Sequence, residues 1–397
     1  MAPFLIGNVL WILREAARRD LKKLFFIARD GQVLLDIALE LANKVGYHGE
    51  LKYLYGSRQA WVPPSLKTLD AAAFDAICPI DGDVDERTLR LVLSRFDVPA
   101  ESIESHLTES GFTSRSLDSH LDDEARLRLR ALLVENADVR GEVFRIAAEN
   151  RALVLDYLQQ EGVITDDSIG IIHQGTGSTL YNALGALLAT VDQAPPHGFY
   201  FGLRADAPDR GFGEPQTYIR NERRPTGFLS TPGLLTLTEM ACSADHGSVV
   251  GYRREGEEVL VNLAQENFAA VDWGFLVVRR VVRSVAAHLA VVPFVIPEHI
   301  DLRPATIDGF ENFWKHPTAS EARVWGSYPF EDGWGEDSVT VPLATKQHLI
   351  SVIRPAPHRH WWGGGAQALS RPLPRTIMRS RADAIRIARR AKRKFVH

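Results

Sequence analysis

The chain has 397 residues, of which 45% are apolar and 24% are charged. This is a globular composition, which excludes a chain that is disordered throughout, and the length corresponds to about two or three domains. The chain has 46 lysines and arginines against 50 acids, a net charge of −4. No general basic field attracts nucleic acid, so we expect no nucleic-acid partner.

The two cysteines, Cys78 and Cys242, cannot form a disulfide framework or a cysteine-based zinc site. They fit a reducing compartment. The apolar N-terminus is followed by its charges instead of being preceded by them, unlike a signal peptide. The apolar run at residues 274–296 has arginines near its middle, unlike a membrane-spanning helix. We therefore expect a cytoplasmic protein.

The first 60 residues follow a strand–helix–strand pattern. Apolar residues at helical spacing predict an amphipathic helix over residues 4–19. The run at 24–28 is apolar without alternation, which is typical of a strand buried on both faces. A helix over 33–45 and a second strand at 51–55 complete a βαβ unit, which implies a parallel sheet covered by helices.

The segment 70–160 is rich in Leu, Arg, Asp, Glu and Ala, and predicts a helical insertion or cap. A second βαβ unit follows, with a strand at 169–172, a helix at 180–188 and another strand at 198–201. An irregular stretch follows at residues 204–235, then a hairpin over 249–261 and helices over 268–291. The periodicity of residues 293–374 supports no assignment.

The sequence thus predicts an α/β fold: a Rossmann-like parallel sheet with helices on both faces, a helical insertion, and a helical or irregular C-terminal part. The α/β core is expected in two parts, residues 1–69 and 166–262, with the insertion at 70–165 between them. The C-terminal region covers 263–370 and the basic tail 371–397.

The tail at 371–397 holds ten Lys or Arg residues against one acid, Asp383, with apolar residues at near-helical spacing. A basic amphipathic helix can lie on anionic lipid. The tail therefore predicts a peripheral contact at the inner face of the membrane, with a solvated terminus as the alternative.

Parallel sheets bind ligands beyond the carboxyl ends of their strands, where the strand order reverses. Three loops leave the ends of predicted strands here: residues 29–31, 56–58 and 173–179. If the sheet forms, these loops share one rim. The rim would hold an anion through Arg29, Gly31, Ser57 and Arg58.

The loop HQGTGST at residues 173–179 precedes a helix. Its glycines allow a close backbone approach, and a helix N-terminus suits phosphate. It matches neither a Walker loop nor a dinucleotide fingerprint. Phosphate or sugar-phosphate binding is one interpretation, and a tight turn with a helix cap is the other. The candidate residues are Gln174, Gly175, Thr176, Gly177, Ser178 and Thr179, with His173 as a catalytic candidate.

The segment Arg29-Asp30-Gly31 invites comparison with haloacid-dehalogenase-like phosphatases. Their first motif has a nucleophilic Asp at a strand end and a second Asp two positions later, before Gly. Asp30 matches the second Asp, but Ala28 occupies the nucleophile position and cannot form an aspartyl-phosphate. Asp30 can still be a general acid, a metal ligand or an orienting group. The alternative is that Asp30 caps the following helix.

Two further residues, Glu239 and His246, pair an acid with an imidazole in one short segment and are candidates to support the site. The metal, if any, stays unknown, and Mg²⁺ is a candidate through Asp30.

Several short motifs resemble a family of bacterial predicted hydrolases in the haloacid-dehalogenase superfamily, which occur among surface-polysaccharide and glycosyltransferase genes. The motifs are APFLIG (2–7), LFFIARDG (24–31), YLYGSR (53–58), IGIIHQG (169–175), EMACSADHG (239–247) and FWKHPTASEA (313–322). The resemblance implies a phosphorylated sugar or nucleotide-sugar as ligand.

Two differences from that family affect the chemistry. Its longer members carry a phosphatase-like domain upstream of the Arg-Asp-Gly segment, so this chain resembles their downstream half, and a phosphatase-domain partner is conceivable. The family also tends to place Asp where His173 stands. A histidine is neutral or cationic near neutral pH, so it cannot simply replace a carboxylate.

Three functions remain open at this stage. The first is an enzyme, or a hydrolase-related protein, acting on a phosphorylated sugar or nucleotide-sugar. The second is a phosphoribosyltransferase-like enzyme, although His173 and Gln174 stand where paired acids normally precede such a loop. The third is a non-catalytic accessory protein of a glycosyltransferase system, which the missing nucleophile favours.

Overall fold

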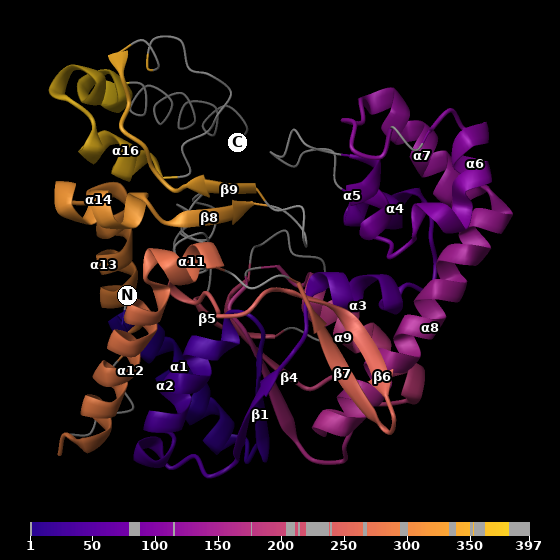
Figure 1. The fold of residues 1–397 in the computed structure, drawn as a ribbon. Helices are drawn as coiled ribbons and strands as arrows, with labels where there is room; N and C mark the ends of the chain where they lie inside the picture. The colour runs from indigo at the N-terminus through magenta and orange to yellow at the C-terminus, as the bar shows by residue number, and fades with distance from the viewer. Residues whose placement is uncertain are drawn as a thin grey trace, which may run out of the picture.

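The centre of the molecule is a five-stranded sheet (Figure 1). The computed structural model describes residues 2–78, 88–113, 116–175, 177–203, 211–212, 215–219, 238, 240–264, 268–293, 301–332, 339–349, 352 and 362–380. The strands are β1 (Lys23–Ile27), β2 (Glu50–Leu54), β3 (Ile169–His173), β4 (His197–Gly202) and β5 (Gln216–Ile219). They pair in the order β2-β1-β3-β4-β5, and every pair is parallel. The predicted α/β fold with a parallel sheet is confirmed.

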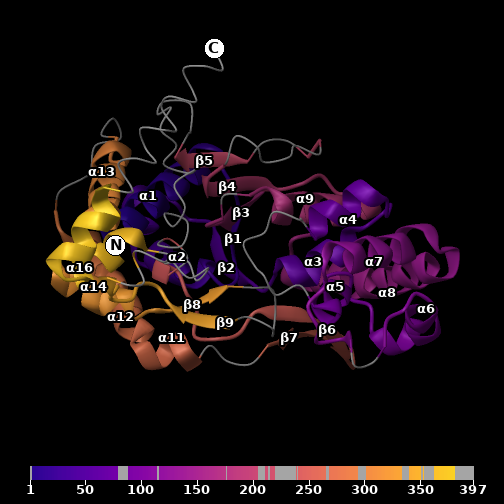
Figure 2. The ribbon, with the colours of Figure 1, turned by 90° about the horizontal axis from the view of Figure 1, so that it is seen from above.

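Helices cover both faces of the sheet, because side chains alternate between the faces along each strand. Leu24 and Phe26 of β1 belong to one buried cluster, which includes residues of α1 and α2. Phe25 and Ile27 belong to a second cluster, under α3, α8 and α9. Figure 2 shows α1 and α2 on one side of the sheet and α3 and α9 on the other. The bounds are α1 Ala2–Arg18, α2 Gly31–Leu41, α3 Arg58–Ser65, α8 Ala137–Glu161 and α9 Thr179–Leu188.

The two predicted βαβ units are confirmed, with ends that differ from the expected ones by a few residues. The helix expected over 33–45 is α2 followed by a short 3-10 turn, η1 (Asn43–Val45). Gly46 ends that turn with φ of 75°, a left-handed conformation that glycine adopts without steric cost.

The region between β2 and β3 is helical in the residues that are described, as the sequence predicted. Phe74 and Phe96 stack inside it at 5.5 Å between ring centroids. The guanidinium of Arg126 is buried there and donates to Asp75 and to the carbonyl of Cys78, each at 2.6 Å. In Figure 1 this insertion lies at the upper right, above the sheet. Its elements besides α8 are α4 (Ala71–Ile77), α5 (Leu89–Ser94), η2 (Ala100–Ile103), α6 (Glu104–Glu109) and α7 (Asp123–Glu135).

After the sheet the chain forms the predicted hairpin and the predicted helices. Strands β6 (Val249–Glu255) and β7 (Glu258–Leu263) pair antiparallel. Helices α11 (Phe268–Trp273) and α12 (Phe275–Val291) follow, and α12 packs along α2. None of the helices in the described ranges is long and apolar enough to cross a bilayer.

Two regions differ from the sequence prediction. The stretch 204–235, expected to be irregular, contains β5, a four-residue strand that pairs only with β4 among the described strands. The C-terminal region, predicted to be helical or irregular but without assigned elements, contains helices and a hairpin among its described residues. They are α13 (Arg303–Lys315), α14 (Ala319–Gly326), β8 (Pro329–Asp332), β9 (Val339–Pro342) and α16 (Gly363–Leu369). The strands β8 and β9 and the helices α14 and α16 are too short for a clear period to appear in the sequence. Helix α13 has 13 residues and buries Ile307, Phe310 and Trp314 at helical spacing, but proline, glycine and tryptophan in and around it obscured this period.

Contacts between aromatic rings hold the C-terminal elements together. Trp362 is fully buried, stacks on Trp314 with centroids 5.6 Å apart, and donates its indole proton to the Trp314 carbonyl at 2.7 Å. Of the basic tail, residues 372–380 are helical. Residues 381–397 lie outside the described residues, and the predicted membrane contact stays a prediction.

A substitution at Gly31 tests how closely α2 packs against β1. A Cβ at this position lies 2.6 Å from the carbonyl carbon of Phe26. We expect Gly31→Ala to push α2 away from the strand and to lower the free energy of unfolding by about 1–3 kcal/mol. Chemical denaturation measures the change.

Gly141 is the matched control. It lies in α8, where a Cβ meets no atom of the described residues within 4 Å. Alanine favours the helix there by up to about 1 kcal/mol. Equal losses in Gly31→Ala and Gly141→Ala contradict the close packing of α2 on β1.

Candidate functional site

The three rim loops meet at one edge of the sheet. Phe26 of β1 stands opposite Tyr53 of β2 and Ile172 of β3, so these strands end at the same level. Strand order reverses between β1 and β3, because β2 lies outside β1 and the later strands lie beyond β3. Ligands of open parallel sheets bind beyond such a switch point.

Asp30 follows β1 at this point and precedes the first residue of α2. Its side chain forms no cap hydrogen bond to that helix, so the capping alternative is not observed. Burial raises the pKa of the Asp30 carboxyl to about 6, although the positive charges of Arg29 and Arg58 act in the opposite direction. Near neutral pH this carboxyl can both accept and donate a proton.

Arg58 reaches the site because α3 begins directly after β2. Ser57 caps that helix: its Oγ accepts from the amide of Ala60 at 3.0 Å and donates to the carbonyl of Val249 at 2.6 Å. A hydroxyl has a single proton. Ser57 therefore has no proton left for a phosphate oxygen, and Arg58 is the remaining candidate at this loop for binding an anion.

His173 ends β3 and lies edge-on to Tyr200 of β4, with ring centroids 5.1 Å apart. Burial lowers the pKa of the His173 imidazole to about 4, with a further lowering by the charge of Arg58. His173 is therefore neutral near pH 7. Its Nδ1 is buried and has no hydrogen-bond partner among the described residues.

Gly175 has a steric role beside that ring. A Cβ at Gly175 lies 2.4 Å from Nε2 of His173, so a larger residue would displace the imidazole. Gly177 is partly buried. Ser178 is buried, and its Oγ accepts from the side-chain amide of Asn182 at 3.1 Å. Thr179 is exposed at the start of α9, and Thr176 lies outside the described residues.

Gln174 pairs with Asn8, which the sequence analysis did not single out. Nδ2 of Asn8 donates to Oε1 of Gln174 at 3.1 Å, and both side chains are 1% exposed. Oδ1 of Asn8 and Nε2 of Gln174 are buried and lack partners in the described part of the chain. If both amides are flipped, the pair still presents one acceptor and one donor. A partner that both donates and accepts, such as water or a sugar hydroxyl, fits it.

His246 lies at the rim beside two tyrosines. Its Nδ1 is 2.8 Å from the carbonyl of Gly247, and its Nε2 is 2.8 Å from the hydroxyl of Tyr53. Because a carbonyl only accepts, Nδ1 carries a proton. In the neutral imidazole Nε2 then accepts from the hydroxyl of Tyr53, which also lies 3.4 Å from the carbonyl of Arg29. Burial lowers the pKa of His246. Tyr55 lies next to both rings, with centroids 5.0 Å from Tyr53 and 5.3 Å from His246.

An ion-pair network holds the His246 loop in place. Arg279 of α12 donates to both carboxylate oxygens of Asp36 on α2, at 2.5 and 3.2 Å. The same guanidinium donates to Asp245 at 2.9 Å, and Gln32 donates to Asp245 at 2.7 Å. No local pattern in the sequence indicates this network. Glu239, expected near His246, lies outside the described residues.

The described part of the rim holds no ready-made cluster of metal ligands. Within the described ranges, no three His, Cys, Asp or Glu side chains are grouped as metal ligands. The described rim offers Asp30, while Asp36 and Asp245 are paired with Arg279. We derive no step through a metal.

Neither known protein-family models nor curated proteins matched this chain. The residues of the rim and the resemblance of the short motifs are therefore the features that indicate a function.

The raised pKa of Asp30 predicts how the stability of the protein depends on pH. The folded-state value of about 6 exceeds the ordinary value of 3.8, so the folded state binds the proton more tightly. Stability therefore falls as pH rises from about 4 to about 6. Asp30→Asn removes this cost, which is at most about 3 kcal/mol at pH 7. Thermal unfolding should show a higher Tm at pH 7 and little difference near pH 4.

Asp36→Asn is the control with the opposite sign. It weakens a partly buried, two-pronged bond to Arg279 and should lower stability by about 1–3 kcal/mol at pH 7. If Asp30→Asn is destabilising to the same degree at pH 7, Asp30 is held by favourable contacts and not strained by burial.

Proposed function

We propose that this protein binds a phosphorylated sugar or a nucleotide-sugar at the rim of its sheet and acts on the phosphate in bacterial surface-polysaccharide biosynthesis. The supporting observation is Asp30, a carboxyl with a pKa of about 6 beside Arg29 and Arg58 at the switch point. Two cations suit an anionic group, and a carboxyl that titrates near neutrality suits proton transfer.

The phosphate would lie against the guanidiniums of Arg29 and Arg58. Arginine is suited to this because its planar fork binds two phosphate oxygens at once. Tyr53, Tyr55 and His246 form the aromatic side of the same rim and offer ring faces to the sugar. The Asn8–Gln174 amide pair matches a hydroxyl in its donor and acceptor.

The proposed reaction is a direct displacement, because Ala28 cannot form a covalent phospho-enzyme. Asp30 accepts the proton of an attacking water as its oxygen bonds to phosphorus. The bond between phosphorus and the sugar oxygen breaks, and that oxygen leaves with the electron pair and takes a proton from solvent. Arg29 and Arg58 stabilise the charge on the phosphoryl oxygens. His173 is neutral, so it can orient a hydroxyl but adds no charge.

A second candidate is a non-catalytic accessory role, in which the rim holds the same ligand for a glycosyltransferase or phosphatase-domain partner. Alanine at position 28 favours it. The polysaccharide setting and both kinds of partner come from the family resemblance. Binding to the rim is common to both candidates, and turnover belongs to the first alone.

The test combines binding and turnover. Isothermal titration with inorganic phosphate, sugar 1-phosphates and UDP-sugars should show binding, weakened by at least about tenfold in Arg58→Ala. Arg253→Ala is the matched control, an exposed arginine of β6 that should bind as the wild type does. Phosphate release from the same compounds should fall by about 10²-fold or more in Asp30→Asn.

The outcomes separate the candidates. Binding that needs Arg58, without turnover of any compound, supports the accessory role. Binding that is unchanged in Arg58→Ala removes the rim as the ligand site. Turnover that persists in Asp30→Asn removes Asp30 as the acid–base group.

A further inference from the structure

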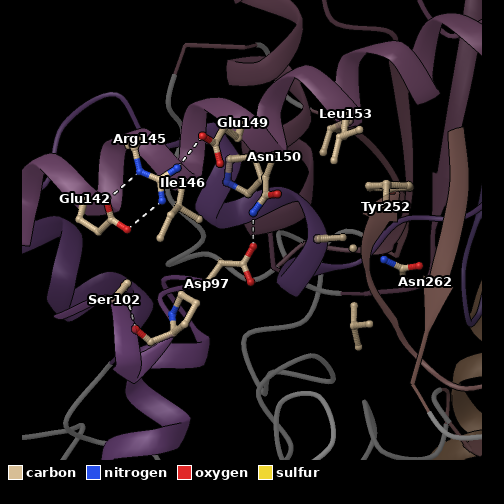
Figure 3. Close-up of a pocket in the computed structure, with 16 residues that line it drawn as sticks. Asp97, Ser102, Glu142, Arg145, Ile146, Glu149, Asn150, Leu153, Tyr252 and Asn262 are labelled. Atoms are coloured by element: carbon tan, nitrogen blue, oxygen red, sulfur yellow. Dashed lines mark hydrogen bonds and ion pairs between the residues drawn. The ribbon is translucent and has the colours of Figure 1, made fainter. Parts of the chain in front are cut away.

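A cavity of about 410 Å³ lies away from the rim, between the helical insertion and the β6–β7 hairpin. Helix α8 forms one wall, the segment from Asp97 to Ser102 a second, and β6 a third (Figure 3). The volume is that of a site for a small molecule. The proposed function does not use this cavity.

Asp97 is the notable polar group of the cavity. Burial raises the pKa of its carboxyl. The side-chain amide of Asn150, from α8, donates to one carboxylate oxygen, as Figure 3 shows. Within the described residues Asp97 has no ion pair. A half-buried carboxylate with one neutral donor and, within the described residues, no cation has room for a positively charged partner, because burying part of a charge costs free energy unless the charge is paired.

The other acids of the cavity already share a cation. Arg145 donates to both carboxylate oxygens of Glu142 at 2.8 Å and to Glu149 at 2.5 Å, on the exposed side of α8. The lining thus has three carboxylates and one guanidinium, a formal charge of 1 − 3 = −2. This charge favours a cation over an anion or a neutral ligand.

The rest of the lining is mixed: Ser102, Asn150 and Asn262 are polar, and the apolar side chains are held in position. Ile146, Leu153 and Val154 contribute from α8. The ring of Tyr252 stacks on Tyr157 with centroids 4.6 Å apart. Its hydroxyl accepts from the indole of Trp61 at 2.8 Å and donates to the carbonyl of Tyr55 at 2.7 Å. These walls suit the aliphatic part of an organic molecule.

We propose that this cavity binds a small organic cation, an ammonium group on an aliphatic chain, whose charge pairs with Asp97. The apolar walls bind the chain, and the carboxylate supplies the counter-charge that its surroundings lack. A metal ion fits less well, since no cluster of three metal-ligating side chains occurs in the described ranges.

The probe is n-pentylammonium, compared with pentanol and pentanoate of the same length and with Mg²⁺ and Ca²⁺, by isothermal titration against the full chain. We expect pentylammonium to bind at least tenfold more tightly than the neutral and anionic analogues. Asp97→Asn should weaken it at least tenfold. Asparagine keeps an acceptor for Asn150 and tolerates the left-handed φ of 59° at this position.

Two further variants locate the binding. Gly251→Leu adds a bulky side chain at a lining residue of β6, where a Cβ meets no atom of the described residues within 4 Å, so we expect a folded protein that binds the probe at least tenfold more weakly. Glu149→Gln is the matched control, because this exposed carboxylate is already paired with Arg145. It should change the affinity less than threefold.

Thermal unfolding shows whether each variant is folded. If Asp97→Asn does not fold, the affinity of Gly251→Leu for the probe tests whether the cavity is the binding site. The proposal is overturned by equal binding of the three pentyl compounds, by binding of metal ions alone, or by no binding at all. Equal weakening by Asp97→Asn and Glu149→Gln also overturns it, because it indicates diffuse attraction instead of a pair with Asp97.

Discussion

The parallel register of β1 with its two neighbours is the constraint on which the candidate site depends. Because β2 and β3 both pair in step with β1, three segments that are far apart in the sequence leave the sheet at one level. Asp30, Arg58 and His173 thereby come within electrostatic reach of one another. A slip of one residue in β3 would turn its side chains to the opposite face and separate Gln174 from Asn8.

Carboxylates of this protein fall into two groups with different physical consequences. Asp36, Asp75 and Asp245 are paired with arginines and tie elements together. Asp30 and Asp97 have no such ion pair within the described residues, and burial raises the pKa of each. A polar group that costs free energy in the folded state points to chemistry or to a ligand. The rim and the cavity each hold one such carboxyl.

The hairpin β6–β7 connects these two places. Val249 accepts the hydroxyl proton of Ser57 beside the rim, and three residues later Tyr252 forms a wall of the cavity. Tyr252 also bonds to the carbonyl of Tyr55, whose ring faces His246. The hairpin, outside the central sheet, thus contributes to the geometry of both.

The resemblance to haloacid-dehalogenase-like hydrolases led to Asp30 and to the rim, but it cannot supply the mechanism. Ala28 removes the covalent step, and a neutral His173 replaces a carboxylate. The structure also changes the roles of two matching residues. Ser57 uses its proton within the fold, and Gly175 makes room for His173. The chemistry therefore has to follow from the residues present.

The sequence by itself determined the strands of the two βαβ units, the helical insertion and the order in which the rim loops leave the sheet. These features depend on local periodicity and on runs of apolar residues, which one stretch of chain contains completely. It did not reveal β5 or the C-terminal elements, most of which are too short for a clear period. Only the tertiary structure decided which polar groups meet: Asn8 with Gln174, Tyr53 with His246, and Asp97 with Asn150. Those contacts join residues from 53 to 193 positions apart, and no local pattern encodes a distance across the fold.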